Sequence, residues 1–104
     1  MSANRGEVWL ADLGMAAKVR PVLVISVEYG DRDYALLGVV PHTTNPRGSQ
    51  FEVNLSVVGL QPGAFNIQGM IAVPNAKLLR KVAALTPAQQ TVVEAAIRRW
   101  LGLV

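Results

Sequence analysis

The stretch that most constrains the fold is residues 18–26, which read KVRPVLVIS. Val22, Leu23, Val24 and Ile25 are consecutive apolar residues, and three of these four are β-branched, as is typical of a strand. Their side chains alternate between the two faces, which predicts a strand with little exposure on either side, in the centre of a small sheet or barrel. Proline has no backbone N–H and therefore cannot donate to the hydrogen-bond ladder in the middle of a sheet. We expect the strand 21–26 to begin at Pro21, with Arg20 at its entry.

Further short segments show strand patterns, and turn-forming residues separate them. We expect strands at 6–13, 34–40, 51–55 and 69–73. Pro41 is expected to end the third strand, and the Thr-, Asn-, Pro- and Gly-rich residues 42–50 are expected to form a loop. Residues 59–63 favour a turn. The segment 77–82 fits either a short strand or a turn of helix.

The C-terminal part of the chain predicts a helix. Thr86 suits the N-cap, Pro87 suits the first helical position, and Gln89 completes a capping box. Apolar residues then recur at helical spacing as far as Leu101, and Gly102 is a plausible stop. A single domain over residues 1–104 follows, mainly β with a C-terminal α-helix, arranged as a small barrel-like fold with the helix packed on it.

The amino-acid composition limits the classes of function that this chain can have. No apolar run reaches the length of a membrane span, and the first residues have no hydrophobic signal core, so we expect a cytoplasmic protein. The chain has no cysteine and one histidine, which excludes thiol catalysis and a histidine-rich metal site. The net charge of +3 mildly favours a polyanionic partner. Apolar residues make up 51% of the chain, and some of them are expected to be covered by another subunit.

The polar groups that remain lie near strand ends. They are Arg20, the loop residues His42, Thr43, Thr44, Asn45 and Arg47, and the cations Lys77, Arg80 and Lys81. Arginines and hydroxyls at the mouth of a barrel can hold a phosphodiester and stabilise the charge that develops when a neighbouring 2′-hydroxyl attacks it. That reaction needs no metal and no other cofactor.

Four successive segments, at residues 5–13 (RGEVWLADL), 20–26 (RPVLVIS), 39–45 (VVPHTTN) and 51–55 (FEVNL), resemble signatures of the MazF/PemK (Kid) toxin family in order and approximate spacing. The second half of the chain matches more loosely. The resemblance implies an SH3-like barrel of the CcdB/PemK kind and a homodimer. It also implies a growth-inhibiting toxin that cleaves single-stranded RNA, including mRNA, without a metal and is inhibited by a cognate antitoxin.

Carried over by residue, the resemblance implies that Arg20 and Thr43 are catalytic. A guanidinium has no lone pair that accepts a proton, so electrostatic stabilisation is favoured over a general-base role for Arg20. Thr43 would hold the phosphate through its hydroxyl. His42, Thr44, Asn45, Arg47 and Lys77 are the candidate RNA-binding residues, and His42 is also the only side chain here whose ordinary pKa lies near neutrality.

The chain departs from the family pattern in two segments. The loop at 14–18 is shorter than usual, and residues 74–77 read PNAK where many members have Asp-Gln-x-Arg. These departures support an alternative hypothesis, a catalytically weakened barrel that acts as a protein- or RNA-binding module. A third hypothesis is a toxin with a protein target such as gyrase, as in the related CcdB-type barrels.

Overall fold

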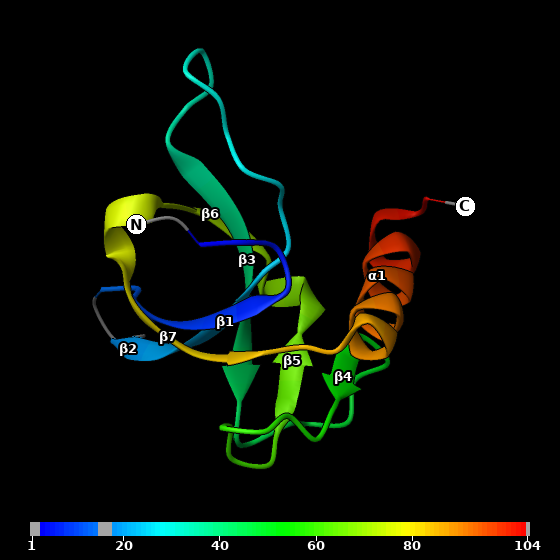
Figure 1. Cartoon of the computed structure of the whole chain (residues 1–104). Helices are drawn as coiled ribbons and strands as arrows, with labels where there is room; N and C mark the ends of the chain where they lie inside the picture. The colour runs from blue at the N-terminus through cyan, green and yellow to red at the C-terminus, as the bar shows by residue number, and fades with distance from the viewer. Residues whose placement is uncertain (1–2, 15–17, 104) are drawn as a thin grey trace.

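A computed structural model describes residues 3–14 and 18–103 and shows a bent β-sheet with one α-helix against it (Figure 1). The strands are β1 (Glu7–Asp12), β2 (Val19–Val24), β3 (Leu36–Thr43), β4 (Glu52–Asn54), β5 (Ala64–Asn66), β6 (Ile71–Pro74) and β7 (Leu78–Ala84). The short 3-10 turns η2 (Ile67–Gly69) and η3 (Asn75–Lys77) flank β6, and the helix α1 (Pro87–Leu101) follows β7. The predicted class, mainly β with a C-terminal helix, is confirmed.

The strands form a sheet in the order β4-β5-β3-β2-β1-β7, and each pairing in it is antiparallel. The long strand β3 connects the two parts of this sheet, because it pairs with β2, β5 and β6. One edge of β3 pairs with β2, whereas the other edge pairs first with β6, over Leu36–Val39, and then with β5, over His42 and Thr43. The C-terminal end of β3 therefore lies between β2 and β5.

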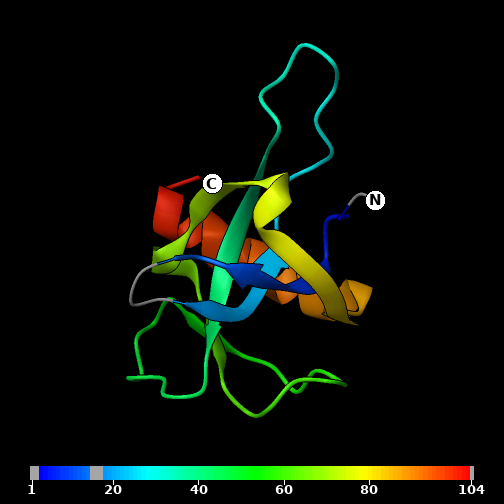
Figure 2. The same cartoon turned by 90° about the vertical axis from the view of Figure 1, so that its left-hand side faces the viewer.

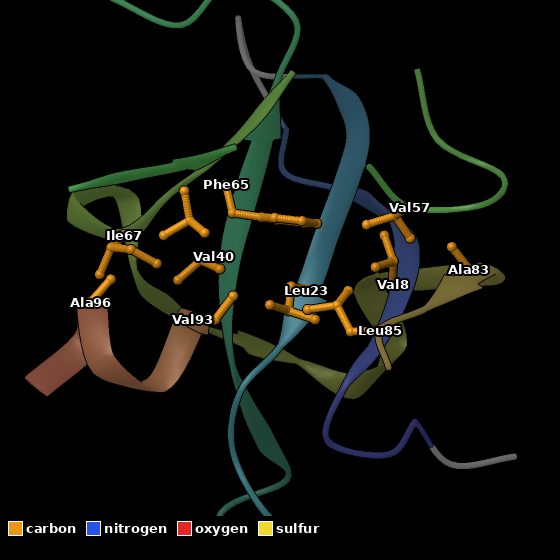
Figure 3. Packing of buried hydrophobic residues seen from close by; sticks show 11 residues of the cluster. Val8, Leu23, Val40, Val57, Phe65, Ile67, Ala83, Leu85, Val93 and Ala96 are labelled. Atoms are coloured by element: carbon orange, nitrogen blue, oxygen red, sulfur yellow. The ribbon is translucent and has the colours of Figure 1, made fainter. Parts of the chain in front are cut away.

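The strand β2 is buried on both faces, as its apolar run predicts. Val22 and Val24 pack in one apolar cluster, with Trp9 and Val39, on one side of the sheet. Leu23 packs on the other side, in the cluster that the sheet forms with the helix residues Val93 and Ala96. Figure 3 shows this second cluster between β3, β2 and α1. Packing on both faces makes β2 a rigid support for the residues at its ends.

The helix begins as its sequence predicts. The Thr86 hydroxyl accepts a hydrogen bond from the Gln89 N–H, and the Gln89 side chain accepts one from the Thr86 N–H. Gly102 ends the helix with a φ of 71°, a left-handed conformation that glycine adopts readily. In the part of the chain that the structure describes, no helix is both long and apolar enough to cross a membrane.

The expected effect of the two prolines on strand bounds was wrong. The strand β2 begins at Val19, before Pro21, and β3 continues through Pro41 to Thr43. Pro21 is tolerated because its part of β2 pairs with β1 alone, the ladder with β3 starting at Val22. Pro41 lies where the other edge of β3 changes partner from β6 to β5, so that ladder is interrupted there. His42 and Thr43 therefore belong to a strand and not to the expected loop.

Other bounds also differ from the expectation. The strand β5 lies in a segment for which no strand was expected, just after the predicted turn at 59–63. The ambiguous segment 77–82 is largely the strand β7. The predicted strand 69–73 becomes β6 at Ile71–Pro74, because η2 occupies the residues before it. Of the short loop at 14–18, residues 15–17 lie outside the described part of the chain.

Candidate functional site

The register of β2 and β3 brings Arg20 and Thr43 together. Val22 pairs with Pro41 and Val24 with Val39, so extending the same register by two residues sets Arg20 opposite Thr43. Opposite residues of an antiparallel pair project to the same face of the sheet. Both side chains are partly buried, and both line the same clefts. The register thus places a charged residue and a hydroxyl residue opposite each other at neighbouring ends of β2 and β3.

Two clefts meet at this strand end, and Arg20, Thr43 and Asn45 line both of them. The first cleft has a volume of about 420 Å³. Its other lining residues are Leu10, Val19, Pro21, His42, Thr44, Gly59, Leu60, Gln61, Arg80 and Val82. The second cleft has a volume of about 300 Å³, and its other lining residues are Pro41, Arg47, Ser49, Glu52, Asn66 and Gln68. The loops 44–51 and 55–63 both lie beyond this end of the sheet (Figures 1 and 2).

Two residues that line the first cleft each have a buried side-chain atom without a hydrogen-bond partner. Among the residues that the structure describes, Arg20 Nε and His42 Nε2 are the buried side-chain nitrogen or oxygen atoms without one. Leaving such a group buried and unpaired costs roughly 1–3 kcal/mol, and native proteins contain few of them. Both atoms belong to residues that line the first cleft, so this end of the sheet carries polar groups that the fold itself leaves unpaired.

The Thr43 hydroxyl is held in place but retains a hydrogen to donate. Its oxygen accepts a hydrogen bond of 3.1 Å from the Asn45 N–H. A hydroxyl also carries one O–H donor, which this contact leaves available for an anionic oxygen. Thr44 and Asn45 are exposed just beyond it, where β3 gives way to the loop.

The loop 44–51 is organised by the carboxylate of Glu52. This carboxylate accepts hydrogen bonds from the N–H groups of Arg47 and Ser49, at 3.1 and 2.8 Å. The bond from Arg47 and the bond from Ser49 lower the pKa of Glu52 below its ordinary value, since they favour the charged form. The loop is thereby folded so that the exposed Arg47 lines the second cleft.

His42 is packed tightly against β5. Its ring meets the ring of Phe65 edge to face, with centroids 5.1 Å apart. A side chain at Gly63 would place its Cβ 2.8 Å from His42 Cε1 and 2.1 Å from the Thr43 carbonyl oxygen, so only glycine permits this approach. Burial lowers the pKa of His42, because it disfavours the charged imidazolium.

The charges of the first cleft favour an anionic ligand. Its charged lining residues are Arg20 and Arg80, and both are cations. The second cleft contains Arg20 and Arg47 and also Glu52, whose carboxylate is already bonded to backbone N–H groups. In the described ranges, 3–14 and 18–103, no group of three or more His, Asp or Glu residues is arranged to hold a metal ion. The arrangement is suited to binding a phosphate group through arginine and hydroxyl donors.

The candidate RNA-binding residues fall into two groups. His42, Thr44, Asn45 and Arg47 line one or both clefts with Arg20 and Thr43. Lys77 is exposed at the end of η3 and lines neither.

Sequence reasoning did not single out several other lining residues, namely Gln61, Ser49, Glu52, Asn66 and Gln68. Those on β4 and β5 reach the cleft only through strand pairings that no local pattern encodes.

The fold and site define a class of small β-barrel proteins with a cleft at one end of the sheet whose charged lining residues are cations. Residues 4–101 match the family model described as PemK-like, MazF-like toxin of type II toxin-antitoxin system. The chain belongs to this family of toxins. The resemblance inferred from the four sequence segments is therefore confirmed.

Solved structures with the same fold include toxins of several bacteria. An endoribonuclease from a Mycobacterial species, in complex with its cognate antitoxin, is 25% identical with a TM-score of 0.84, over 99% of this chain and 98% of that one. The Mycobacterium tuberculosis toxin MazF-mt6 is 29% identical with a TM-score of 0.81, over 94% and 98%. A MazE-MazF complex from Deinococcus radiodurans is 18% identical with a TM-score of 0.83, over 100% and 99%, and shows the fold alone. No curated protein matches the chain significantly in sequence.

Proposed function

We propose that this toxin is an endoribonuclease that cleaves single-stranded RNA, including mRNA, without a metal ion. The observation that carries the proposal is that Arg20, whose buried Nε has no hydrogen-bond partner, and Thr43 line the same cleft, and that the charged lining residues of this cleft are cations. A phosphodiester supplies the anionic oxygens that both groups lack. Membership of the toxin family and the likeness to the mycobacterial endoribonuclease, at 25% identity, support the same activity.

The proposed reaction uses the 2′-hydroxyl of the RNA as the nucleophile. The 2′-oxygen attacks the adjacent phosphorus, the bond from phosphorus to the 5′-oxygen breaks, and a 2′,3′-cyclic phosphate forms. Arg20 stabilises the negative charge that builds on the phosphate oxygens, and the Thr43 hydroxyl donates to one of them. Because Arg20 is held on a strand packed on both faces, its guanidinium needs little reorganisation during the reaction.

The neighbouring residues would bind the RNA on either side of the scissile phosphate. Thr44, Asn45 and His42 line the first cleft, and Arg47 carries a cation into the second. Lys77, outside both clefts, would contact RNA only where the strand leaves them. Backbone contacts of this kind give affinity that falls as salt rises.

The proposed regulator is a cognate antitoxin protein, since the 25% identical structure was solved with one. We place the action of this toxin in the cytoplasm, where mRNA is available. A second copy of the chain is the other proposed partner. Large apolar side chains are exposed on the sheet, among them Leu36, Ile71 and Leu79, and a homodimer would cover part of this surface.

The test is incubation of the purified protein with RNA of mixed sequence in the presence of EDTA. We expect cleavage by the native protein, fragments that end in 2′,3′-cyclic phosphate, and no cleavage by Arg20→Ala. An absolute requirement for a divalent ion would contradict the mechanism. Intact RNA together with tight binding of RNA or of a protein would instead support the alternative of a catalytically weakened binding module.

A further inference from the structure

The face of the sheet that carries Arg20 and Thr43 also carries an asparagine. On β3, Thr43 and Pro41 lie two residues apart and therefore project to one face. Thr43 pairs with Ala64 of β5. Two residues further along the same register, Asn66 lies opposite Pro41 and projects to that face as well. Like Arg20 and Thr43, Asn66 lines the second cleft.

The side-chain amide of Asn66 has a fixed orientation. Asn66 is the N-cap of η2, and its Oδ1 accepts a hydrogen bond of 3.2 Å from the Gln68 N–H. Because only the amide oxygen can accept this bond, the Nδ2 amino group takes the other position. Gly69 packs closely beside it, since a Cβ at Gly69 would lie 3.2 Å from Nδ2 and 2.8 Å from Pro41 Cγ. The cap and this packing hold the amide in place.

The Nδ2 group of Asn66 is a donor that is open to the second cleft. It donates to no other residue in the described ranges, 3–14 and 18–103, and it is not one of the buried unpaired atoms, so it reaches solvent. The carboxylate of Glu52, which pairs with Asn66 across β4 and β5, accepts the N–H groups of Arg47 and Ser49 instead. The cleft thus presents an N–H donor without an acceptor from the fold.

The second cleft suits a nucleotide that binds beside the scissile phosphate. Its volume of about 300 Å³ lies within the range of small-ligand sites. Arg20, Thr43 and Arg47 can hold phosphate oxygens, while Asn66 lies on the β5 wall of the same cleft. Phosphate contacts are the same for every nucleotide, so a preference among bases has to come from a group that contacts a base edge.

We infer that Asn66 is a specificity-determining residue, which selects uracil or guanine at a nucleotide next to the scissile phosphate. The inference rests on the proposed ribonuclease activity and adds which bases the site accepts. The bases of single-stranded RNA can be splayed out and recognised at their edges. Uracil O4 and guanine O6 can accept the Nδ2 N–H. The amino groups of cytosine and adenine occupy the same places, and they would leave two donors facing each other.

The first arm of the test maps the fragment ends that native protein and Asn66→Asp produce from RNA of mixed sequence in EDTA. Aspartate keeps an acceptor for the Gln68 N–H, so the cap remains, but it replaces the Nδ2 donor with an acceptor. At one of the two nucleotides beside the cleaved bond, we expect native protein to prefer uracil or guanine over cytosine or adenine by about 10-fold. Asn66→Asp should reverse this preference at the same nucleotide.

Asn54→Asp is the matched control. It introduces the same charge at an exposed residue of β4 that lines neither cleft, and it should keep the native base preference. The preference is a ratio within one reaction. A loss of overall rate, which the added negative charge can cause through repulsion of the RNA, therefore does not change the readout.

The second arm uses native protein alone and does not depend on the folding of a variant. The preferred base is replaced by an analogue that lacks its carbonyl oxygen, which is 2-pyrimidinone for uracil or 2-aminopurine for guanine. Cleavage should slow by about 10-fold when the analogue lies at the selected nucleotide, and should not change when it lies far from the cleaved bond.

RNA cleavage with the same base preference in Asn66→Asp as in native protein would overturn the inference and leave the ribonuclease proposal intact. So would a native preference for cytosine or adenine at both nucleotides beside the cleaved bond, or an analogue that is cleaved as fast as the natural base. Native protein that cleaves no RNA would overturn both proposals.

Discussion

The first cleft and the N-terminal corner of the molecule differ in whether their polar side chains have hydrogen-bond or ion-pair partners. We define the N-terminal corner as residues 4–7 with their partners Lys81 and Glu94. There Arg5 pairs with Glu94, and Glu7 accepts hydrogen bonds from the Asn4 N–H and the Trp9 indole and an ion pair from Lys81. In the first cleft, by contrast, Arg20 Nε and His42 Nε2 are buried without partners. Paired groups stabilise a fold, whereas unpaired buried groups are rare in native proteins, and we propose that a ligand supplies the partner in the first cleft.

Glu7 illustrates the paired case. Burial alone would raise the pKa of this carboxyl, but the hydrogen bonds from Asn4 and Trp9 and the nearby Lys81 outweigh it, and the pKa is lowered. Trp9 itself is a buried core residue. The comparison predicts that changes in the cleft alter activity more than stability, and that changes in the corner do the reverse.

The largest effect is expected for Arg20→Ala. Loss of a preorganised donor to the developing charge should lower the cleavage rate by about 10²–10³-fold or more, with little change in melting temperature. Single-turnover cleavage of a fluorescent RNA and thermal unfolding would measure the two quantities. A large drop in melting temperature with retained cleavage would place Arg20 among the structural groups.

Thr43→Val should have the next largest effect. Valine keeps the shape and β-branching of the strand residue but removes the hydroxyl, whose bond to a charged oxygen is worth about 1.5–3 kcal/mol. We expect cleavage to slow by about 10–100-fold, and Thr43→Ser to recover most of that loss. Equal rates for the two variants would show that the hydroxyl does not touch the phosphate.

Thr86→Ala tests a paired group outside both regions, at the N-cap of α1. It removes the cap at the N-terminus of α1 and should lower the free energy of unfolding by about 1 kcal/mol. Cleavage by the folded protein should not change, since Thr86 lines neither cleft. Denaturant unfolding, with an activity assay at a temperature where both proteins are folded, would measure this.

A smaller effect is expected for Lys81→Met, which breaks the ion pair with Glu7 at 3.1 Å. Because about half of the Lys81 side chain is exposed, at 49%, the loss in stability should stay below about 1 kcal/mol. Raising the salt concentration should weaken the difference between this variant and native protein. A loss that persists in high salt would indicate packing by the lysine stem instead.

Glu52→Gln probes a paired group inside the site. The pKa of Glu52 is lowered in the folded chain, so its contribution to stability is present above about pH 4.5 and is lost as the pH falls through the folded value. Glutamine does not titrate, so its contribution to stability would not change with pH in this way. Melting temperatures of the two proteins should therefore converge as the pH falls below 4.5, and a constant difference would contradict the role assigned to this carboxylate.

How far the sequence predicts the molecule depends on whether the determining contacts are local. The buried strand around Leu23 and the cap at Thr86 follow from nearby residues, and both are confirmed. The prediction for Pro41 was wrong because the strand tolerates a proline where one edge of β3 changes its partner from β6 to β5. The residues next to Pro41 in the sequence do not indicate where this change occurs. The catalytic roles of Arg20 and Thr43 were inferred from a family resemblance, and the strand register, extended by two residues, places these two residues opposite each other.

The far wall of the site could not be predicted for the same reason. Gly63 reads as an ordinary turn residue, yet its missing side chain is what allows β5 to approach His42 and Thr43. Asn66 and Gln68 join the second cleft only because β5 pairs with β3 and β4.

The most direct test of the central claim, that the unpartnered groups of the first cleft are ligand-binding groups, is a nitrogen-15 NMR titration with an RNA that has 2′-deoxyribose at the cleaved position. Signals of Arg20 Nε and His42 Nε2 should shift and saturate together, whereas the side chain of Arg5, already paired, should not respond. Unchanged signals for Arg20 and His42 at saturating RNA would contradict the claim.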